Sequence, residues 1–394
     1  MTEASHARPV LGVGMVGHSF MGAAHSQAWR AAHRFFDLPL RPRMVVLAGR
    51  DPGRAVEAAR RLGWAAAESD WRQLVARDDV DLVDVCTPGD SHAEIAVAAL
   101  EAGKHVLCEK PLANSVAEAE AMVEAAARAA SRGVRCMVGF TYRRVPAVAL
   151  ARQLVEEGRV GDVRHVRGQY LQDWLADPEV PLSWRLHAER AGSGALGDIG
   201  SHLVDLAQHV TGDHVTGVDG LLATFVEERP LPAGGGEPSG ATGAGRGRVT
   251  VDDAAMFLAR FGSGAAGVFE ATRSATGRKN ALRLEVNGTR GSVAFDFEDM
   301  NVLHFYDATD QPRTGGFRRI VVTEAAHPYV AAWWPPGHGL GYEHAFTHQV
   351  VDLVTAIGAG RDPEPSFADG LQVQRVLAAV VDSWRTQRWQ ELSG

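Results

Sequence analysis

A carboxylate and an imidazole stand one helical turn apart in the glycine-rich stretch 192–205. At helical spacing Asp198 and His202 share a face, which Asp205 and His209 continue, while apolar residues form the opposite stripe. Each interior glycine disfavours a plain helix by about 1 kcal/mol relative to alanine. We therefore expect a helix that presents an acid/base pair and whose start approaches a ligand or another element too closely for a β-carbon. A packed helix with a solvated polar face is the competing interpretation.

Glycines also mark the end of the first expected strand. A short apolar run from Pro9 leads into glycines spaced as G-x-G-x-x-G, and a helical stretch follows through Trp29. This spacing matches a dinucleotide-binding fingerprint, in which one glycine permits a tight turn, one lets the backbone reach the pyrophosphate and one allows close helix packing. The cofactor residues predicted at this turn are Gly12, Gly14, Met15, Val16 and Gly17.

Strands and helices then alternate as far as residue 139. We expect further strands at 43–48, 64–67, 81–86, 104–108 and 135–139. The helices expected between them are 53–62, 70–76, 91–102 and 115–131. This alternation predicts an α/β fold, a doubly wound parallel sheet that binds its ligand at the carboxyl ends of the strands. Thr87, Pro88, Glu109 and Lys110 follow two of these strands and are candidate cofactor residues.

The end of the second strand bears on the choice of cofactor. A carboxylate normally ends this strand and binds the ribose hydroxyls, but here the chain reads Ala48-Gly49-Arg50-Asp51. Arg50 could face a 2′-phosphate, stack on adenine or be a solvated loop residue, and Asp51 could reach the ribose. We expect NAD as the cofactor, and NADP is not excluded.

Longer alternating segments follow residue 139. We expect strands at 163–173, 215–226, 248–261, 265–273, 282–287 and 292–297. They predict a second, α+β domain over 140–394 with a large, mainly antiparallel open sheet, after a first domain over 1–139. One half-exposed face of such a sheet would suit a homo-oligomer, a dimer or tetramer. The Gly- and Pro-rich segment 229–247 predicts a flexible loop, and the Trp333-Trp334 tract predicts either a loop covering a cleft or a small satellite core.

Composition narrows the class of protein. The chain has 394 residues, 45% of them hydrophobic, and a formal net charge of -8 without a basic block, so it is long enough for two domains and nucleic-acid binding is not expected. No apolar run reaches the length of a membrane span, and we expect a cytoplasmic protein. Cys86, Cys108 and Cys136 predict small core residues. His344 and His348 lack the glutamate of a metalloprotease motif, so no metal site is predicted.

The order of these motifs resembles the Gfo/Idh/MocA oxidoreductases over nearly the whole chain. The segments that carry the resemblance are the glycine fingerprint, Glu109-Lys110-Pro111 and the stretch that holds Asp198 and His202. The resemblance implies that Lys110 reaches the nicotinamide and the substrate, and that Asp198 and His202 complete the active site. It further implies that Thr87, Pro88 and His92 lie near the cofactor.

A closer likeness is to the levoglucosan dehydrogenase-like branch, which oxidises a secondary hydroxyl of a sugar, typically at carbon 3. It rests on the segments 19–26, 35–39 and 333–344. Many relatives have asparagine at the position of Thr141, so the substrate contacts of that segment differ. The candidate substrate residues are Tyr142, Arg143, Trp184, Arg185 and His344.

Oxidation of a secondary alcohol needs a hydride acceptor and a base. Histidine suits the base because its unperturbed pKa is about 6.5, so we expect His202 to take the proton and Asp198 to hold the hydroxyl or orient the site. Lys110 would stabilise the charge that develops on oxygen, or would itself be the proton acceptor. The alternatives are an inositol or aminoglycoside dehydrogenase, a keto-sugar reductase, and a non-catalytic sensor that binds dinucleotide and sugar.

Overall fold

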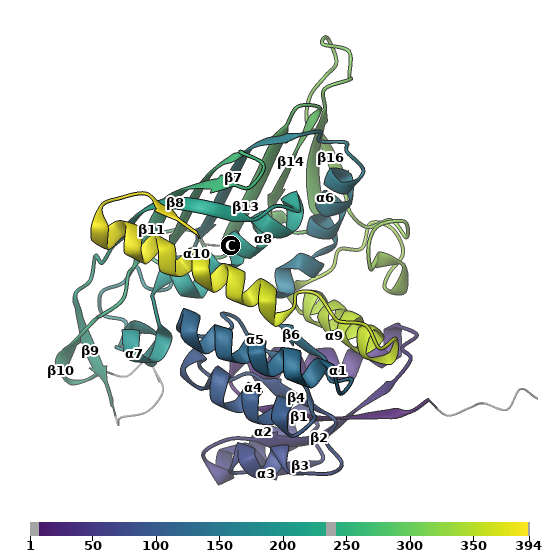
Figure 1. Ribbon diagram of the computed structural model, residues 1–394, viewed down its shortest axis with the longest axis vertical. Coiled ribbons are helices and arrows are strands. Elements are labelled where there is room, and N and C mark those ends of the chain that lie inside the picture. Colours follow the sequence, from purple (N-terminus) through teal and green to yellow (C-terminus); the bar gives the residue numbers. More distant parts are fainter. Residues whose placement is uncertain (1–7, 234–241, 393–394) are drawn as a thin grey trace, which may run out of the picture. The chain divides into compact units, whose positions relative to one another are not determined.

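The computed structural model describes residues 8–233 and 242–392, and these fall into two compact units (Figure 1). Unit 1 comprises the described residues of 1–113, 117–144 and 341–371, and unit 2 comprises those of 114–116, 145–340 and 372–394. The expected boundary at residue 139 is a single cut in the chain, whereas the compact units are interleaved. No helix in the described ranges is long and apolar enough to cross a membrane.

Unit 1 holds a six-stranded parallel sheet in the order β3-β2-β1-β4-β5-β6. Its strands are β1 (Val10–Val16), β2 (Arg41–Ala48), β3 (Ala66–Glu68), β4 (Leu82–Val85), β5 (His105–Cys108) and β6 (Cys136–Val138). The interleaved helices are α1 (Phe20–Phe35), α2 (Pro52–Leu62), α3 (Trp71–Val75), α4 (His92–Glu101) and α5 (Val116–Ala130). The doubly wound parallel sheet predicted from the alternation is confirmed, because β2 and β3 lie on one side of β1 in the sheet and β4, β5 and β6 lie on the other.

Local sequence explains where these helices begin and end. In α2, Asp51 accepts a hydrogen bond from the backbone N–H of Arg54, Pro52 occupies the first turn, and Gly63 ends the helix in the left-handed conformation, with φ 83°. Asp70 caps α3 in the same manner, through the N–H of Arg72. The helix boundaries expected from the sequence therefore agree with the structure to within a residue or two here.

A helix from the far end of the chain completes unit 1. In α9 (Tyr342–Gly358), Phe346 and Val350 share a hydrophobic core with Trp29 and Ala32 of α1. The amphipathic pattern of this segment predicts a helix. It does not indicate that the helix returns to the first domain.

Unit 2 is built on a nine-stranded sheet in the order β16-β15-β14-β13-β7-β12-β11-β8-β17. Its strands are β7 (Val163–Leu171), β8 (Val215–Ala223), β11 (Ala254–Phe261), β12 (Ala266–Thr272), β13 (Ala281–Gly288), β14 (Gly291–Asp296), β15 (Val302–Asp307), β16 (Arg318–Val321) and β17 (Gln390–Glu391). All neighbours are antiparallel except β12 and β7, which run parallel. The mainly antiparallel open sheet is confirmed. β15, β16 and β17 were not predicted.

Helices cover one face of this sheet, as Figure 1 shows for α6 (Pro146–Glu156) and α8 (Ser201–Thr211). The remaining helices are short α7 (Ala188–Ala191) and long α10 (Phe367–Thr386). Single turns of 3-10 helix lie at 89–91, 141–144, 184–186, 297–299 and 330–332.

The prediction of a flexible loop over 229–247 is wrong. β9 (Glu228–Pro232) and β10 (Thr242–Arg248) pair as an antiparallel ribbon, and the tip of the predicted loop, 234–241, lies outside the described residues. Arg229 is fully buried and donates hydrogen bonds to the carbonyl oxygens of Leu175 and Asp177, both at 2.8 Å. The Gly- and Pro-rich composition predicted a loop because it does not reveal this long-range anchor.

Candidate active site

The glycine turn in unit 1 is tightly packed against its own surroundings. A β-carbon on Gly12 would lie 2.0 Å from the carbonyl oxygen of Asp79, and one on Gly17, whose φ is 101°, would lie 2.6 Å from that of Cys86. A β-carbon on Gly22, in the first turns of α1, would meet the Gly17 carbonyl oxygen at 2.4 Å. Close helix packing thus also depends on Gly22, which the sequence fingerprint did not include.

This turn fits a dinucleotide pyrophosphate. The first N–H groups of α1 have no partner within the helix, and no acidic residue stands in the first turn to repel an anion. The side chains of Met15 and Val16 are buried, so of these two predicted cofactor residues only the backbone is available at the turn. The bound group would be held there chiefly by main-chain N–H groups and the helix dipole.

At the end of β2, Asp51 already has a structural role. Its Oδ1 accepts the N–H of Arg54 at 2.9 Å to cap α2. Arg50 is exposed, and the ring of His18 lies so close to Gly49 that a β-carbon there would be 2.5 Å from it. These residues line the strand end where a ribose binds in this fold, and the second oxygen of Asp51 is compatible with that contact.

His92 joins two loops at the carboxyl ends of the strands. One ring nitrogen lies 2.8 Å from the carbonyl oxygen of Thr87, and the other lies 3.0 Å from that of Pro111. Ser91 also donates to the Thr87 hydroxyl and to the Pro88 carbonyl oxygen. His92 is 1% exposed, so its position favours holding these loops in place over contacting a ligand directly.

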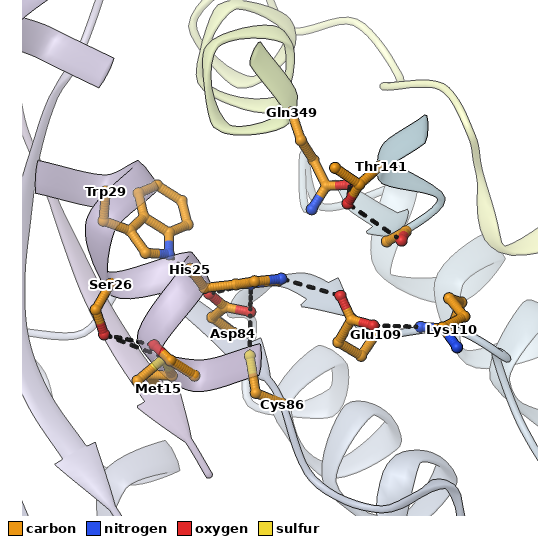
Figure 2. A network of polar contacts seen from close by, with 12 residues as sticks. Met15, His25, Ser26, Trp29, Asp84, Cys86, Glu109, Lys110, Thr141 and Gln349 are labelled. Atoms are coloured by element: carbon orange, nitrogen blue, oxygen red, sulfur yellow. Dashed lines mark hydrogen bonds and ion pairs between the residues drawn. The ribbon is translucent and has the colours of Figure 1, made fainter. Parts of the chain in front are cut away.

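The predicted cofactor residue Glu109 faces the interior of unit 1, as Figure 2 shows. Its Oε1 lies 2.9 Å from Nε2 of His25, its Oε2 accepts the backbone N–H of Lys110 at 3.2 Å, and the residue is 4% exposed. Direct contact between the Glu109 carboxylate and a cofactor is therefore not favoured, since both oxygens are engaged. Lys110 itself is half-buried at the end of β5.

Three predicted substrate residues also belong to unit 1. Tyr142 is buried with its ring 6.4 Å from that of Tyr342, and Arg143 forms an ion pair with Asp369 at 3.5 Å. His344 lies in the first turn of α9, and its Nδ1 accepts the N–H of Gly341 at 3.0 Å. Because that nitrogen is an acceptor, the proton of the neutral ring is on Nε2. His348, one turn on, is fully buried, and burial lowers its pKa to about 3.

The other predicted substrate residues lie in unit 2. The guanidinium of Arg185 stacks over the ring of Trp184 at 4.5 Å, and both side chains are half-buried. Trp333 and Trp334 lie in a surface loop, with Trp334 44% exposed, which favours the loop interpretation over a satellite core. Asn301 fixes the end of this loop through two hydrogen bonds with Leu340.

The proposed acid/base residues stand on an irregular helix start. Leu196–Gly200 form a π-helical turn that leads into α8, so Asp198 lies in the wider turn and His202 in the regular helix. Such insertions are often found at functional sites. The side chain of Asp198 is 29% exposed, and His202 is 8% exposed with its ring 5.9 Å from that of Tyr170.

Hydrogen bonds to Asp252 hold this turn in place. Its carboxylate accepts the N–H groups of Gly194 and Leu196, at 2.7 and 2.8 Å, and its carbonyl oxygen accepts that of Ala195. A β-carbon on Gly194 would lie 1.7 Å from that carbonyl oxygen. The expected close approach at the helix start is thus to another element, the segment before β11.

Arg273 was missed by the sequence analysis. It is fully buried at the end of β12, where its Nη1 forms an ion pair with Asp198 at 3.3 Å and its Nη2 donates to the Asp252 carbonyl oxygen. The Asp198 carboxylate thus lies against a buried guanidinium and accepts a hydrogen bond from it. In the sequence, Arg273 is marked only as a charged residue at the end of an apolar strand.

The predicted ionisable face of α8 is not a solvated one. Asp205 is 1% exposed, and Gln208 is also buried, its Oε1 accepting the N–H of Val215. Ser201, Leu203 and their neighbours are buried as well, so the helix packs on nearly all sides. The competing interpretation of a solvated polar face is therefore wrong.

Comparison with known proteins agrees with this geometry. Residues 11–140 match the oxidoreductase family with an NAD-binding Rossmann fold, and residues 148–294 match the GFO/IDH/MocA C-terminal domain. A levoglucosan dehydrogenase from Pseudarthrobacter phenanthrenivorans is 45% identical over 384 residues, which are 96% of this chain and 97% of that protein.

Solved structures are similar over the same range. An oxidoreductase domain protein from Kribbella flavida has a TM-score of 0.94 and 69% identity, covering 98% of this chain and 100% of the other. A levoglucosan dehydrogenase in complex with NADH and levoglucosan has a TM-score of 0.91 and 44% identity, with the same coverage. The chain therefore belongs to the GFO/IDH/MocA family of oxidoreductases, with an NAD-binding Rossmann fold.

Proposed function

We propose that the protein is an NAD-dependent dehydrogenase that oxidises a secondary hydroxyl, at carbon 3, of levoglucosan or a closely related anhydrosugar or glycoside. The observation that carries this is the built acid/base pair of unit 2, in which a buried arginine and an aspartate clamp hold Asp198 one turn before His202. The likeness to a levoglucosan dehydrogenase over nearly the full chain supports the substrate class.

When NAD is bound, its chemistry is acceptance of the hydride. In our proposal His202 accepts the hydroxyl proton, because an imidazole gains and loses protons near neutral pH. Asp198, held by its ion pair with Arg273, accepts a hydrogen bond from a sugar hydroxyl and orients it. Lys110 stabilises the negative charge that develops on the reacting oxygen.

A panel of substrates tests the function. Reduction of NAD and of NADP is followed by absorbance with levoglucosan, a glucoside, an inositol and an aminoglycoside. We expect NADH formation with levoglucosan or the glucoside. Turnover of inositol or aminoglycoside alone would favour those dehydrogenases, and NADH oxidation by keto-sugars without the forward reaction would favour a reductase.

Variants test the residue roles. His202→Ala is expected to lower turnover about a hundredfold or more while NADH still binds in calorimetry. Lys110→Met separates the two candidate proton acceptors, because loss of the base removes the rise of the rate with pH whereas loss of a charge stabiliser lowers the rate at every pH. NADH binding without product from any substrate of the panel would support the sensor function instead, and near-normal turnover in both variants would contradict the residue roles.

We also propose that a second copy of the chain binds the uncovered face of the large sheet. Exposed apolar side chains gather there on neighbouring strands: Leu221 of β8, Leu258 of β11 and Val268 of β12 are 52%, 54% and 40% exposed. Leu258 pairs directly with Val268 of β12, and Met256, two residues before Leu258 on β11, pairs with Leu221 of β8. Exposed apolar side chains gathered on one sheet face favour association with a second copy.

Light scattering tests this assembly. Leu258→Asp is expected to convert a dimer or tetramer into a monomer, because it places a charge in the middle of the patch. The matched control is Val56→Asp, because Val56 on α2 of unit 1 is also an exposed apolar residue, at 61%. A native protein that is monomeric at micromolar concentration would contradict the proposal.

A further inference from the structure

A chain of buried ionisable side chains runs through unit 1 to the backbone of Lys110 (Figure 2). His25 of α1 lies between two carboxylates, with Nδ1 3.0 Å from both oxygens of Asp84 and Nε2 2.9 Å from Oε1 of Glu109. The other oxygen of Glu109 accepts the N–H of Lys110. Asp84, His25 and Glu109 are 0%, 1% and 4% exposed, so the chain is closed to solvent.

The groups around His25 fix its charge. Burial opposes the charged ring, but the Asp84 carboxylate outweighs it and raises the pKa of His25 well above its usual value. Burial and the same carboxylate raise the pKa of the neighbouring Cys86 thiol, which donates to Asp84 at 3.4 Å. From α9, the Phe346 ring is tilted against the His25 ring with 5.4 Å between the ring centres, and burial, with the charges of Tyr142 and Glu109, raises the pKa of Tyr342. An imidazolium can therefore donate to both carboxylates at once.

Stability alone does not explain why these charged side chains are buried. Removing charges from water is unfavourable, and buried ion pairs can often be replaced by apolar residues without loss. Trp29 donates to Asp84 at 2.7 Å and completes a hydrogen-bonded network on β4, where Asp84 lies beside Met15 of β1. Such a network fixes a unique position for its members, here the side chain that precedes Lys110.

We propose that His25 is a positioning residue, which together with Asp84 holds Glu109 against the backbone of Lys110 and so fixes where the Lys110 ammonium stands. Asp84 orients the imidazolium, the imidazolium orients Glu109, and Glu109 anchors the Lys110 N–H. The consequence for catalysis rests on the role of Lys110 in the proposed function. The consequence for the position of Lys110 does not.

A metal ion is the competing occupant of this site. Ligand atoms of His25, Asp84 and Cys86 lie within 4.8 Å of one another, a spacing that could hold a cation. The ring nitrogen and the carboxylate are already at hydrogen-bond distance, however, and the Cys86 thiol donates to the same carboxylate, so each of these ligand atoms has a partner within the protein. Elemental analysis of the purified protein is expected to find no stoichiometric metal, and one equivalent of a metal lost in Cys86→Ala would overturn the proposal.

The chain has only three lysines, Lys104, Lys110 and Lys279, so the position of Lys110 can be observed directly. Reductive methylation with carbon-13 formaldehyde gives one NMR signal for each lysine, and Lys110→Arg assigns the signal of interest. His25→Gln is expected to shift the Lys110 signal and its titration midpoint, while Lys104, bound to the Arg77 and Val80 carbonyl oxygens, and Lys279 stay unchanged.

Ser26→Ala is the matched control. Ser26 follows His25 on α1, is fully buried, and bonds Gly22 and Trp64, so its loss removes buried hydrogen bonds without touching the network. Glu109→Gln is the second variant if His25→Gln does not fold, because the amide NH2 must then face either the imidazolium or the Lys110 N–H, from which it cannot accept a hydrogen bond.

Activity gives the second readout. With levoglucosan, His25→Gln and Glu109→Gln are expected to lower kcat by about tenfold to a hundredfold with KM changed far less, since displacing a reacting group by about 1 Å has effects of this size. Ser26→Ala should keep both the NMR signal and kcat. A Lys110 signal that does not move in either variant would overturn the proposal. A signal that moves in a protein without any turnover would support the positioning and contradict only the proposed function.

Discussion

Two glycines of the Asp198 segment are expected to respond in opposite ways to the same methyl group. In Gly194→Ala the added carbon would lie 1.7 Å from the Asp252 carbonyl oxygen, so the backbone must move. At Gly200 the nearest atoms are at 3.5 Å, an ordinary contact, and the residue has helical angles of φ -63° and ψ -31°. One substitution should therefore break a clamp, and the other should fit.

The structure gives the magnitude. Moving residue 194 breaks the two N–H bonds to the Asp252 carboxylate and strains the third, to its carbonyl oxygen. Hydrogen bonds to charged groups contribute about 1.5–3 kcal/mol each and neutral ones about 1 kcal/mol, so partial relaxation leaves a loss of roughly 3–5 kcal/mol. Gly200→Ala should stabilise by about 0.4–1 kcal/mol, because alanine loses less backbone entropy on folding.

Urea unfolding followed by tryptophan fluorescence measures both free energies. Gly194→Ala should also lower turnover about a hundredfold, because the clamp holds the turn that carries Asp198. Equal stability of the two variants would refute the reasoning, since it would mean that the segment is not held against Asp252.

Three further predictions concern His25, Asp51 and Arg273. Because the folded protein holds the His25 proton above pH 6.5 whereas the unfolded chain releases it, the free energy of unfolding should fall by about 1.4 kcal/mol per pH unit above pH 6.5 until the raised folded pKa is passed. Urea unfolding of His25→Gln should lack this slope, and an identical slope would contradict the assignment. Asp51→Ala should lose about 1 kcal/mol of cap energy and Asp51→Ser far less, while both raise KM for NAD about tenfold in steady-state assays if the carboxylate also binds the ribose. Arg273→Met should lower kcat at least tenfold, because Asp198 loses its buried cation, and Arg273→Lys should restore part of it.

Local spacing explains how much of the fold was predictable. The alternation of strands and helices up to residue 139 depends on short-range patterns, as do the Asp51 cap and the Gly63 stop of α2. The parallel sheet follows from that alternation alone. The return of α9 to α1 does not, because its apolar face would suit any partner.

The candidate site shows the same division. Asp198 and His202 could be predicted as candidate residues because their spacing is local. The close approach at the start of their helix was also expected, but Asp252, which Gly194 contacts, lies 58 residues away in the sequence. His25 and Asp84 are 59 residues apart, so their pairing left no local pattern. Arg229 was assigned to a flexible loop because nothing near it in sequence reveals its bonds to Leu175 and Asp177.

Transfer of the hydride from carbon 3 is the central claim, and isotopic labelling tests it most directly. Levoglucosan carrying deuterium at carbon 3 is incubated with NAD and the enzyme, and the reduced cofactor is examined by mass spectrometry. We predict reduced cofactor one mass unit heavier than that formed from unlabelled sugar. Unlabelled NADH, or NADH formed from an inositol while neither levoglucosan nor the glucoside is oxidised, would contradict the proposed function.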